Sequence, residues 1–366
     1  MHDQDGVNRR RFLQGTAAAA ALTPLAAATA DAATSRTPKN YARIPVEECF
    51  NIPEIVEQQL KMGPGKHAIQ SRLEARRKMY EGVLEVEAGR LRDMDAAGVT
   101  MAVLSINGPG VQNIPDAALA TSLAQIANDR LADLMKKYPK RYGGLLSVAP
   151  QDPAAAAKEI DRGMSRLGMN GVIINSHTND EYLDDPKFSP IFEALIAHKA
   201  PLYLHPREPS RFMSAAQDTP GFNVGWGYAA ETATHVVRLL VGRIFDRYPD
   251  LQLVIGHGGE GLPYFIDRID NRYEFEYNLT GARGLQRKPS EYMKQNIHYT
   301  TSGMNYWPQV KMMIDVIGID RVMFAADYPM EDMIPAVKEM DAAPLSAADR
   351  AKFYHGNAIK LFKLKT

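Results

Sequence analysis

The sequence has very little cysteine and no excess of charge of either sign. Cys49 is the single cysteine among 366 residues, so the chain cannot form an internal disulfide. Lys and Arg together number 43, Asp and Glu also number 43, and the formal net charge is zero. This balance gives no support for nucleic acid or an anionic membrane surface as a partner. Hydrophobic residues make up 45% of the chain, which is normal for a globular core.

Long apolar runs are also scarce. The Ala-rich stretch 17–28 is too short and too weakly apolar to span a bilayer, so we expect no stable membrane insertion. It follows Asn8-Arg9-Arg10-Arg11-Phe12-Leu13-Gln14 and precedes a small-x-small cleavage site at 28–30, an order typical of an export signal. We predict a cleavable twin-arginine signal over 1–33, a linker over 34–43 and a periplasmic location. A disordered basic tail is the alternative.

No Gly-x-Gly-x-x-Gly fingerprint follows a predicted strand, which argues against an open doubly wound sheet that binds a dinucleotide. Continuous apolar runs alternate with amphipathic stretches, a pattern typical of parallel strands buried on both faces. We predict strands over 44–47, 101–106, 142–148, 171–175, 202–205, 251–256, 297–300 and 322–326. Helices are predicted over 84–97, 117–137, 154–167, 188–198, 229–246, 308–317 and 347–362. The pattern predicts one (β/α)8 TIM-type barrel over 44–366, with residues 58–79 inserted after the first strand as a helical lid or dimer element.

Four ionisable side chains stand at the ends of four predicted strands: Glu47, His205, His257 and Asp327. Parallel barrels place their active sites at the C-terminal ends of the strands. Carboxylate and imidazole together suit Mn²⁺ or Zn²⁺. Taken singly, a histidine after a strand is more often a hydrogen-bonded structural residue, and Glu47 could be an exposed rim residue. The four together favour a site for one divalent metal ion. His177 also follows a strand, but could instead cap the next loop.

Several motifs, in a fixed order, carry a resemblance to a known family. They are Glu47-Glu48-x-Phe50, Asp93-Met94-Asp95, Pro109-Gly110-Val111-Gln112, Val148-Ala149-Pro150-Gln151-Asp152-Pro153, Asn175-Ser176-His177-Thr178, His205-Pro206, Phe245-Asp246-Arg247-Tyr248-Pro249, Gly256-His257-x-Gly259-Glu260, Pro263-x-x-x-x-Arg268 and Asp327-Tyr328-Pro329. With them the chain resembles the amidohydrolase-related family of metal-dependent nonoxidative decarboxylases, which includes the γ-resorcylate and 5-carboxyvanillate decarboxylases. The 5-carboxyvanillate group is the more similar of the two.

The resemblance implies that Glu47, His205 and Asp327 bind one divalent metal, Mn²⁺ or Zn²⁺, and that His257 stands beside it as a ligand or as an acid/base. It implies nonoxidative decarboxylation of a hydroxylated aromatic acid of the o-hydroxybenzoate type. In this reaction Asp327 is the expected proton donor, and His257 is expected to steer it.

The resemblance also implies how the small aromatic acid is held. Arg268 matches an arginine that contacts the acidic group of the substrate, from the same subunit or from a neighbouring one, in an expected homodimer or homotetramer. One of Arg76 and Arg77 matches a second substrate arginine. Asn107 and His177 are further candidates for contacts with the substrate.

Two positions depart from the family pattern. Cys49 stands where relatives hold a small residue that is not a ligand; it is expected to be a packing residue, although a thiolate there could ligate the metal and favour zinc. Met330 stands where the 5-carboxyvanillate enzymes have tyrosine, which puts a vanillate-type substrate in doubt. The alternative function is a metal-dependent hydrolase or hydratase that acts on a lactone, amide or ring-cleavage product. A noncatalytic periplasmic protein that binds a metal or an aromatic compound is a further alternative.

Overall fold

The computed structural model describes residues 41–61, 77–217, 222–281 and 284–366. The chain divides into two units, Met1–Pro38 and Lys39–Thr366, and the second unit is described below. The expected export signal, most of the expected linker, Arg76 and most of the expected insertion at 58–79 lie outside the described residues. Among the helices of the described ranges, none is both long and apolar enough to cross a membrane.

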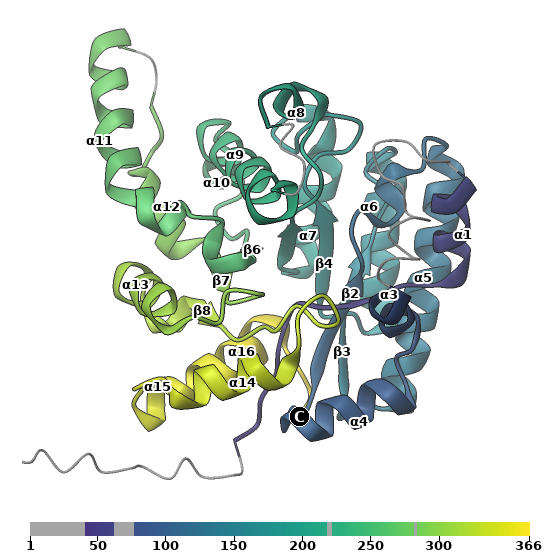
Figure 1. Ribbon diagram of the computed structural model, residues 1–366. Coiled ribbons are helices and arrows are strands. Elements are labelled where there is room, and N and C mark those ends of the chain that lie inside the picture. Colours follow the sequence, from purple (N-terminus) through teal and green to yellow (C-terminus); the bar gives the residue numbers. More distant parts are fainter. Residues whose placement is uncertain (1–40, 62–76, 218–221, 282–283) are drawn as a thin grey trace, which may run out of the picture. The chain divides into compact units, whose positions relative to one another are not determined.

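Eight parallel strands lie side by side in the order of the chain (Figure 1). They are β1 Glu48–Phe50, β2 Ala102–Ile106, β3 Tyr142–Ser147, β4 Gly171–Asn175, β5 Leu202–His205, β6 Leu253–Ile255, β7 Ile297–Thr300 and β8 Val322–Met323. Nearly every residue of these strands is buried, as the continuous apolar runs predicted. The fold is the TIM-type α/β fold.

The first and last strands differ from the predicted bounds. β1 begins at Glu48 and not at residue 44, because Pro45 has no N–H to donate to a ladder. β8 ends at Met323 and not at residue 326, because side chains replace the ladder partners beyond it. The N–H of Ala325 donates to Thr301 Oγ1 at 3.1 Å, and the N–H of Ala326 donates to Glu48 Oε1 at 3.0 Å.

Backbone hydrogen bonds join the two ends of the chain across the seam between β1 and β8. The N–H of Val46 donates to the carbonyl oxygen of Phe324 at 3.2 Å, and the N–H of Cys49 donates to that of Tyr328 at 2.8 Å. The segments that form this seam are separated by about 280 residues of sequence, as the Glu48–Tyr328 contact shows. The seam therefore depends on the whole chain having folded.

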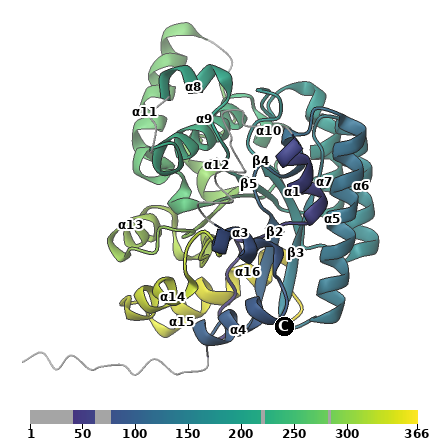
Figure 2. The same cartoon turned by 45° about the vertical axis from the view of Figure 1, so that its right-hand side comes forward.

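Helices surround the strands (Figures 1 and 2). They are α1 Pro53–Lys61, α3 Arg77–Leu84, α4 Ala88–Ala97, α5 Ala117–Lys137, α6 Pro153–Arg162, α7 Ser189–His198, α8 Arg211–Gln217, α9 Tyr228–Val241, α10 Ile244–Arg247, α11 Leu262–Thr280, α12 Pro289–Gln295, α13 Trp307–Ile317, α14 Met333–Ala342, α15 Ala347–Ala351 and α16 Asn357–Phe362. The helix predicted over 229–246 is two helices, because Gly242 caps α9 and Arg243 has a left-handed φ of 63°. Asp116 caps α5 by accepting hydrogen bonds from the N–H groups of Ala118 and Leu119.

Helix α11 was not predicted from the sequence, although it has 19 residues. Its buried residues, Leu262 and Pro263, lie in the first turn, so the helix has no apolar stripe of the usual kind. In Figures 1 and 2 it extends away from the strands, on the side of the molecule opposite to α5 and α6. Large apolar side chains remain exposed along it, including Tyr264 at 76% and Leu279 at 67%.

Candidate metal centre

Glu47 directly precedes β1, and its buried side chain lies in the interior of the barrel. Glu47 Oε2 accepts hydrogen bonds from the hydroxyls of Tyr203, Thr300 and Ser302, on or after strands β5 and β7. A Cβ atom on Gly256 would lie 2.5 Å from Oε2, so only glycine leaves room for the carboxylate there. Glu47 is therefore held inside the barrel, whereas the sequence placed it at the end of the first strand.

The second oxygen of Glu47 faces two imidazole rings. His205 Nε2 lies 3.3 Å from Glu47 Oε1 and His257 Nε2 lies 3.6 Å from it. His257 Nε2 is also 3.6 Å from Asp327 Oδ2. One ligand atom from each of Glu47, His257 and Asp327 lies within 4.8 Å of the others. His205 is not part of this mutually close group, and it joins the site through the contact of its Nε2 with Glu47 Oε1. We refer to Glu47, His257, Asp327 and His205 as the metal cluster. The structure thus brings together all four residues expected from the strand ends.

His257 and Asp327 both have left-handed backbones, with φ of 47° and 71°. A residue other than glycine held in such a conformation costs about 1–3 kcal/mol and often marks a functional site. Glu260 Oε1 is 2.9 Å from His257 Nδ1 and so orients that ring. Glu48 accepts hydrogen bonds from the N–H of Ala326 at 3.0 Å and of Tyr328 at 3.1 Å, one on each side of Asp327. Neighbouring carboxylates therefore hold both strained residues in place.

Charges within the cluster shift its pKa values strongly. Burial would raise the pKa of Glu47, but His257 and His205 lower it to about 2. Burial would lower the pKa of His257, but Glu47 and Glu260 raise it well above the usual value. Burial raises the pKa of Asp327, and His257 opposes that shift. The carboxylates and imidazoles of the cluster are therefore close enough to shift one another's pKa values, and a cation bound between the two carboxylates would be stabilised.

The donors of the cluster fit one divalent metal ion. Glu47 Oε1 is buried and accepts no hydrogen bond, although it lies between two imidazole nitrogens. A buried carboxylate oxygen requires a partner, and a cation among these atoms would supply it. Carboxylate oxygen with imidazole nitrogen is a usual donor set for such ions. We conclude that the cluster is a candidate site for one divalent metal.

Cys49 is buried in β1 and lies outside this group of mutually close ligand atoms, within the described residues. Burial raises the pKa of its thiol well above the usual value, and the charges of Asp327 and Glu47 raise it further. This placement favours the interpretation of Cys49 as a packing residue.

The residues predicted to contact the substrate have different environments. Both ring nitrogens of His177 form hydrogen bonds within the loop: Nε2 donates to the carbonyl oxygen of Glu208 at 3.0 Å, and Nδ1 accepts from the N–H of Asp180 at 3.2 Å. Burial lowers the pKa of this histidine to about 4. Asn107 follows β2 and is partly exposed, and its N–H donates to the carbonyl oxygen of Phe50 at 2.7 Å. Of these two, Asn107 is the one that directly follows the end of its strand.

Within the described residues, none of the three predicted arginines is placed at the metal cluster. Arg268 is exposed on α11. Arg77 begins α3, and its side chain lies outside the description, as does all of Arg76. Glu331 is an exposed residue beyond Asp327, and a Cβ atom on Gly303 would lie 3.5 Å from its Cγ and 3.9 Å from Asp327 Oδ2. The rim beside Asp327 is therefore acidic in the described part of one chain.

Several residues of the site were not assigned from the sequence. They are Glu48, Asn175, Tyr203, Glu260, Thr300, Ser302 and Glu331. The run Thr300-Thr301-Ser302 at the end of a predicted strand was a usable signal, because hydroxyls there face the same edge as the ligands. Glu260 stands three residues after His257, which is a spacing that allows contact within one turn.

A second polar cluster lies beneath α9, and we refer to Ser176, Glu231 and His235 as the closed cluster. His235 Nε2 accepts from the N–H of Leu183 at 3.0 Å, so Nδ1 carries the proton and donates to Ser176 Oγ at 3.1 Å. The hydroxyl of Ser176 donates to Glu231 Oε1 at 3.3 Å. All three side chains are fully buried, so a substrate has no access to them.

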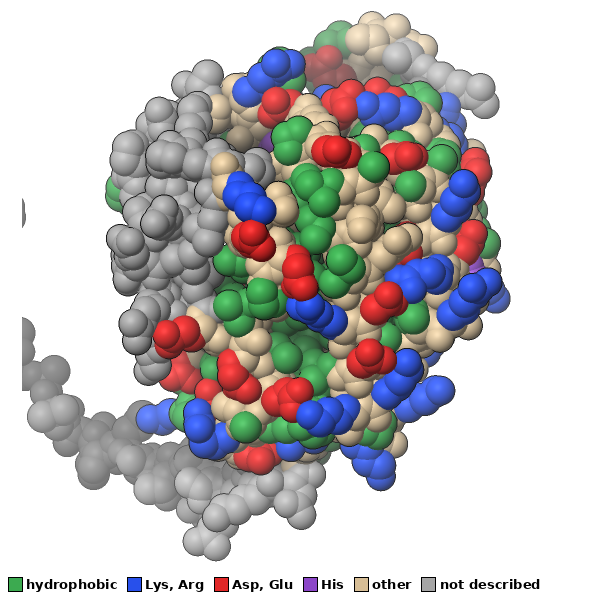
Figure 3. All heavy atoms as spheres, turned by 90° about the vertical axis from the view of Figure 1, so that its right-hand side faces the viewer, with side chains coloured by type: hydrophobic (Ala, Val, Ile, Leu, Met, Phe, Trp, Pro, Cys, Tyr) green, Lys and Arg blue, Asp and Glu red, His purple; other side chains and the backbone are tan. Residues whose placement is uncertain are grey.

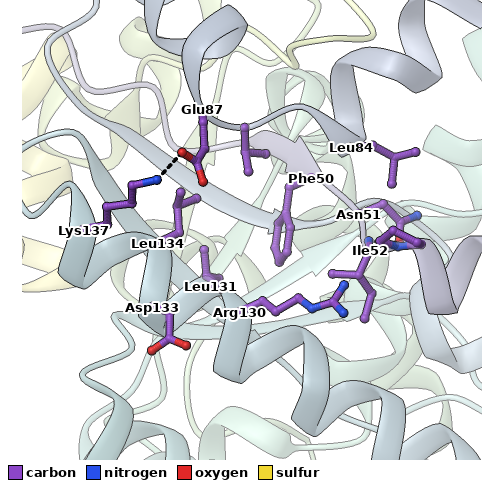
Figure 4. Close-up of a pocket in the computed structure, with 12 residues that line it drawn as sticks. Phe50, Asn51, Ile52, Leu84, Glu87, Arg130, Leu131, Asp133, Leu134 and Lys137 are labelled. Atoms are coloured by element: carbon purple, nitrogen blue, oxygen red, sulfur yellow. Dashed lines mark hydrogen bonds and ion pairs between the residues drawn. The ribbon is translucent and has the colours of Figure 1, made fainter.

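A cavity of about 320 Å³ lies away from both clusters, between the end of β1, helix α5 and the turn that joins α3 to α4. Phe50, Leu131 and Leu134 line it, and Figure 4 shows Lys137 paired with Glu87 beside them. Figure 3 looks onto the side that carries α5 and shows hydrophobic side chains among interspersed acidic and basic ones. Arg130 at the same cavity pairs with Glu54, so both cations here have carboxylate partners. Among the described residues that line the cavity, none is a free cation that could bind an acidic substrate.

The metal cluster at one edge of a parallel barrel is typical of metal-dependent amidohydrolases. An amidohydrolase family model matches residues 81–364, and the chain belongs to this family. It is 35% identical to γ-resorcylate decarboxylase of Rhizobium sp. strain MTP-10005 over 333 residues, which cover 88% of this chain and 98% of that one.

Two solved structures of 5-carboxyvanillate decarboxylases are also similar. The structure from Sphingomonas paucimobilis has a TM-score of 0.85 and 39% identity, covering 89% of this chain and 100% of that chain. The structure from Novosphingobium aromaticivorans, in complex with manganese and 4-hydroxy-3-methoxy-5-nitrobenzoic acid, has a TM-score of 0.83 and 38% identity, covering 89% and 97%.

Proposed function

We propose that this protein catalyses the nonoxidative decarboxylation of a hydroxylated aromatic acid of the o-hydroxybenzoate type at one divalent metal. The observation that carries this proposal is Glu47 Oε1, a buried oxygen without a hydrogen bond that faces His205 and His257, with Asp327 beside them. The similarity to decarboxylases along almost their whole length supports the same reaction.

The native metal is proposed to be Mn²⁺. The cluster offers oxygen and imidazole donors, while the thiol of Cys49 lies outside it, and such a donor set does not select for a softer ion. A similar decarboxylase was solved with manganese. When bound, the ion would supply positive charge to the carboxylate and phenolate oxygens of the substrate.

The residues of this chain would hold and move one proton. Burial keeps the pKa of Asp327 raised, so its carboxyl can carry a proton toward the ring carbon that bears the carboxylate. When that carbon takes the proton, the bond to the carboxylate breaks, its electrons restore the aromatic ring and CO₂ leaves. His257 lies 3.6 Å from Asp327, and Glu260 holds its other nitrogen, so the ring is oriented to return a proton to Asp327.

Turnover in D₂O tests this reaction. An accepted o-hydroxybenzoate should release CO₂ and carry one deuterium on the carbon that bore the carboxylate, as mass spectrometry of the product would show. A panel that includes lactones and amides tests the alternative hydrolase. Hydrolysis of one of these, without CO₂ from any aromatic acid in the panel, would contradict the proposal.

We also propose that the active form is a homodimer or homotetramer in which α11 packs against a second copy. This helix exposes large apolar side chains: Tyr264, Phe265, Phe275, Tyr277 and Leu279. Trp226, just before α9 in the sequence, is also 62% exposed. Exposed apolar surface of this kind usually marks an interface. Arg268 lies on the same helix, and the described rim beside Asp327 is acidic. A second copy would therefore bring Arg268 to the carboxylate of the substrate.

Two variants separate the interface from the substrate contact. Arg268→Lys keeps the charge and loses the planar pair of donors, so kcat/KM should fall strongly while metal content and oligomeric state stay unchanged. Tyr264→Asp places a charge on the apolar face and should shift the protein toward monomer in analytical ultracentrifugation. A monomeric wild-type protein with full activity would contradict the proposal.

Export by the twin-arginine route remains our proposal for residues 1–33, on the basis of Arg9, Arg10 and the Ala-rich stretch behind them. Replacing Arg9 and Arg10 with lysine should keep the precursor in the cytoplasm. Cell fractionation with an antibody against the mature protein measures this, and normal periplasmic accumulation of the variant would contradict it.

A further inference from the structure

Two buried polar atoms without hydrogen bonds belong to residues that are paired in register at the ends of β4 and β5. They are Asn175 Oδ1 and His205 Nδ1. Asn175 and His205 are register partners in these neighbouring parallel strands, so their side chains are neighbours on the sheet. One atom is an acceptor, and the other can carry a proton and donate. Leaving both unpaired would cost about 1–3 kcal/mol for each group, so an interaction between them is favoured.

Glycine at position 108 leaves a space that both atoms border. A Cβ atom on Gly108 would lie 3.0 Å from Asn175 Oδ1 and 3.4 Å from His205 Nδ1. Any larger residue would press on both groups at once. The backbone of Gly108 therefore closes this space without blocking it.

The backbone of Asn175 is held from a third segment. Gln112 Oε1 accepts a hydrogen bond from the N–H of Asn175 at 2.6 Å, and Gln112 Nε2 donates to its carbonyl oxygen at 2.9 Å. Gln112 is itself buried. Asn175 is thus fixed at both backbone groups, while its side-chain oxygen is left for another donor.

His205 points its other nitrogen at the metal cluster, since Nε2 lies 3.3 Å from Glu47 Oε1. A neutral imidazole that offers the lone pair of Nε2 to a cation must carry its proton on Nδ1. Histidine ligands usually donate this second N–H to an oxygen, which fixes the tautomer and the orientation of the ring. Two oxygens border the Cβ position of Gly108 together with Nδ1: Asn175 Oδ1 and the carbonyl oxygen of Pro206. Of the two, Asn175 Oδ1 is a buried side-chain acceptor without a hydrogen bond.

We infer that Asn175 is a positioning residue that accepts the Nδ1–H of His205, directly or through one water molecule, and so presents Nε2 to the metal. This inference rests on the proposed metal site. Asn175 would act through His205 and would not touch the substrate or the metal itself. The loss of such a partner typically lowers metal affinity about 10–100-fold.

The test is Mn²⁺ affinity, measured by competition with a fluorescent chelator on the metal-free protein, which needs no turnover. Asn175→Leu removes the acceptor at nearly constant size and should weaken Mn²⁺ binding about 10–100-fold. Asn175→Asp keeps an acceptor and should bind Mn²⁺ at least as tightly as the wild type. Gly108→Ala leaves both partners in place but crowds them, and should also weaken binding.

A matched control is Asn128→Leu on α5. Asn128 is equally buried, and its amide bonds to Ser147 and Glu159, away from the metal cluster. This variant should lose stability but keep wild-type affinity for Mn²⁺. Circular dichroism confirms folding before each titration.

Native Mn²⁺ affinity in folded Asn175→Leu would overturn the inference. Equal weakening in Asn175→Asp and Asn175→Leu would also overturn it, because it would show a structural role and not that of an acceptor. A wild-type protein that binds no divalent metal would instead overturn the proposed function, so the two failures are distinguishable.

Discussion

The metal cluster and the closed cluster combine the same kinds of side chain, but only the metal cluster contains buried polar atoms without hydrogen-bond partners. Both contain a buried glutamate and at least one histidine. In the closed cluster, both nitrogens of His235 are hydrogen-bonded, and each carboxylate oxygen of Glu231 accepts a bond, from Ser176 and from the N–H of Ser210. In the metal cluster, Glu47 Oε1 and His205 Nδ1 have no hydrogen-bond partner.

The two histidines show the consequence for charge. Burial lowers the pKa of His235 to about 3, with smaller contributions from the charges of His177 and Arg238, so it is neutral at physiological pH. The carboxylates Glu47 and Glu260 raise the pKa of His257 despite its burial. Residue type alone therefore does not mark a functional site. A functional site is marked instead by buried polar atoms that lack hydrogen bonds and lie beside partly exposed candidate ligands.

The largest expected effect separates the clusters by activity. Asp327→Asn should lower kcat/KM by at least about 10²-fold, because it removes the proposed proton donor. Glu231→Gln, the equivalent change in the closed cluster, should leave kcat/KM close to wild type at a temperature where it is folded. Metal content measured by elemental analysis in the same samples separates loss of the acid from loss of a ligand. Equal losses in both variants would break the comparison.

The next effect separates them by stability. His235→Leu leaves the N–H of Leu183 and the hydroxyl of Ser176 without their partner, and should lower the free energy of unfolding by about 1–3 kcal/mol. Mn²⁺ affinity should not change, because the side chains of this cluster bond to one another and to Leu183 and Ser210, and none belongs to the metal cluster. Urea unfolding of the metal-free protein measures the first quantity. If His235→Leu instead loses the metal and stays stable, the roles of the clusters are exchanged.

Acidification sharpens the contrast between the histidines. The folded pKa values of His235 and His177 are about 3 and about 4, below the ordinary value of 6.5. As pH falls from 6.5 toward 4, the unfolded chain binds protons that the folded chain does not, so the free energy of unfolding falls. Stability measured at several pH values should show a smaller fall in His235→Leu than in the wild type. An identical slope in both proteins would mean that His235 is already protonated in the folded state.

The smallest expected effect concerns Cys49. Cys49→Ala removes one buried sulfur and should cost about 1 kcal/mol of stability, while metal content and kcat/KM stay near wild type. Elemental analysis decides the outcome. Loss of the bound metal in Cys49→Ala would show that this thiol is a ligand and belongs to the metal cluster.

The sequence predicted a barrel of eight parallel strands and placed the four residues of the metal cluster at one edge of it, although the first strand, Glu48–Phe50, begins just after the predicted range 44–47. This was possible because buried strands are read as apolar runs, and parallel strands end at the same edge. The depth of Glu47 could not be predicted. Its hydroxyl partners Tyr203 and Thr300 lie on two other strands, and they meet it only through the register of the closed sheet.

Helix α11 was missed for a related reason. Its exposed side chains include Tyr264, Phe265 and Leu279, so it lacks the one-sided apolar pattern by which helices are found. The orphan atoms of Asn175 and His205 are a tertiary feature as well. Both residues were visible at strand ends, but only the register of β4 against β5 makes them neighbours.

The seam between β1 and β8 determines when during synthesis and folding the proposed metal could bind. Glu47 directly precedes the first strand and Asp327 follows the last, so a ribosome must deliver nearly the whole polypeptide before both donors exist together. A bound ion would then stabilise the folded barrel. Each tenfold excess of metal over its Kd would add about 1.4 kcal/mol to the free energy of unfolding. Metal binding would thus occur only after the barrel has folded.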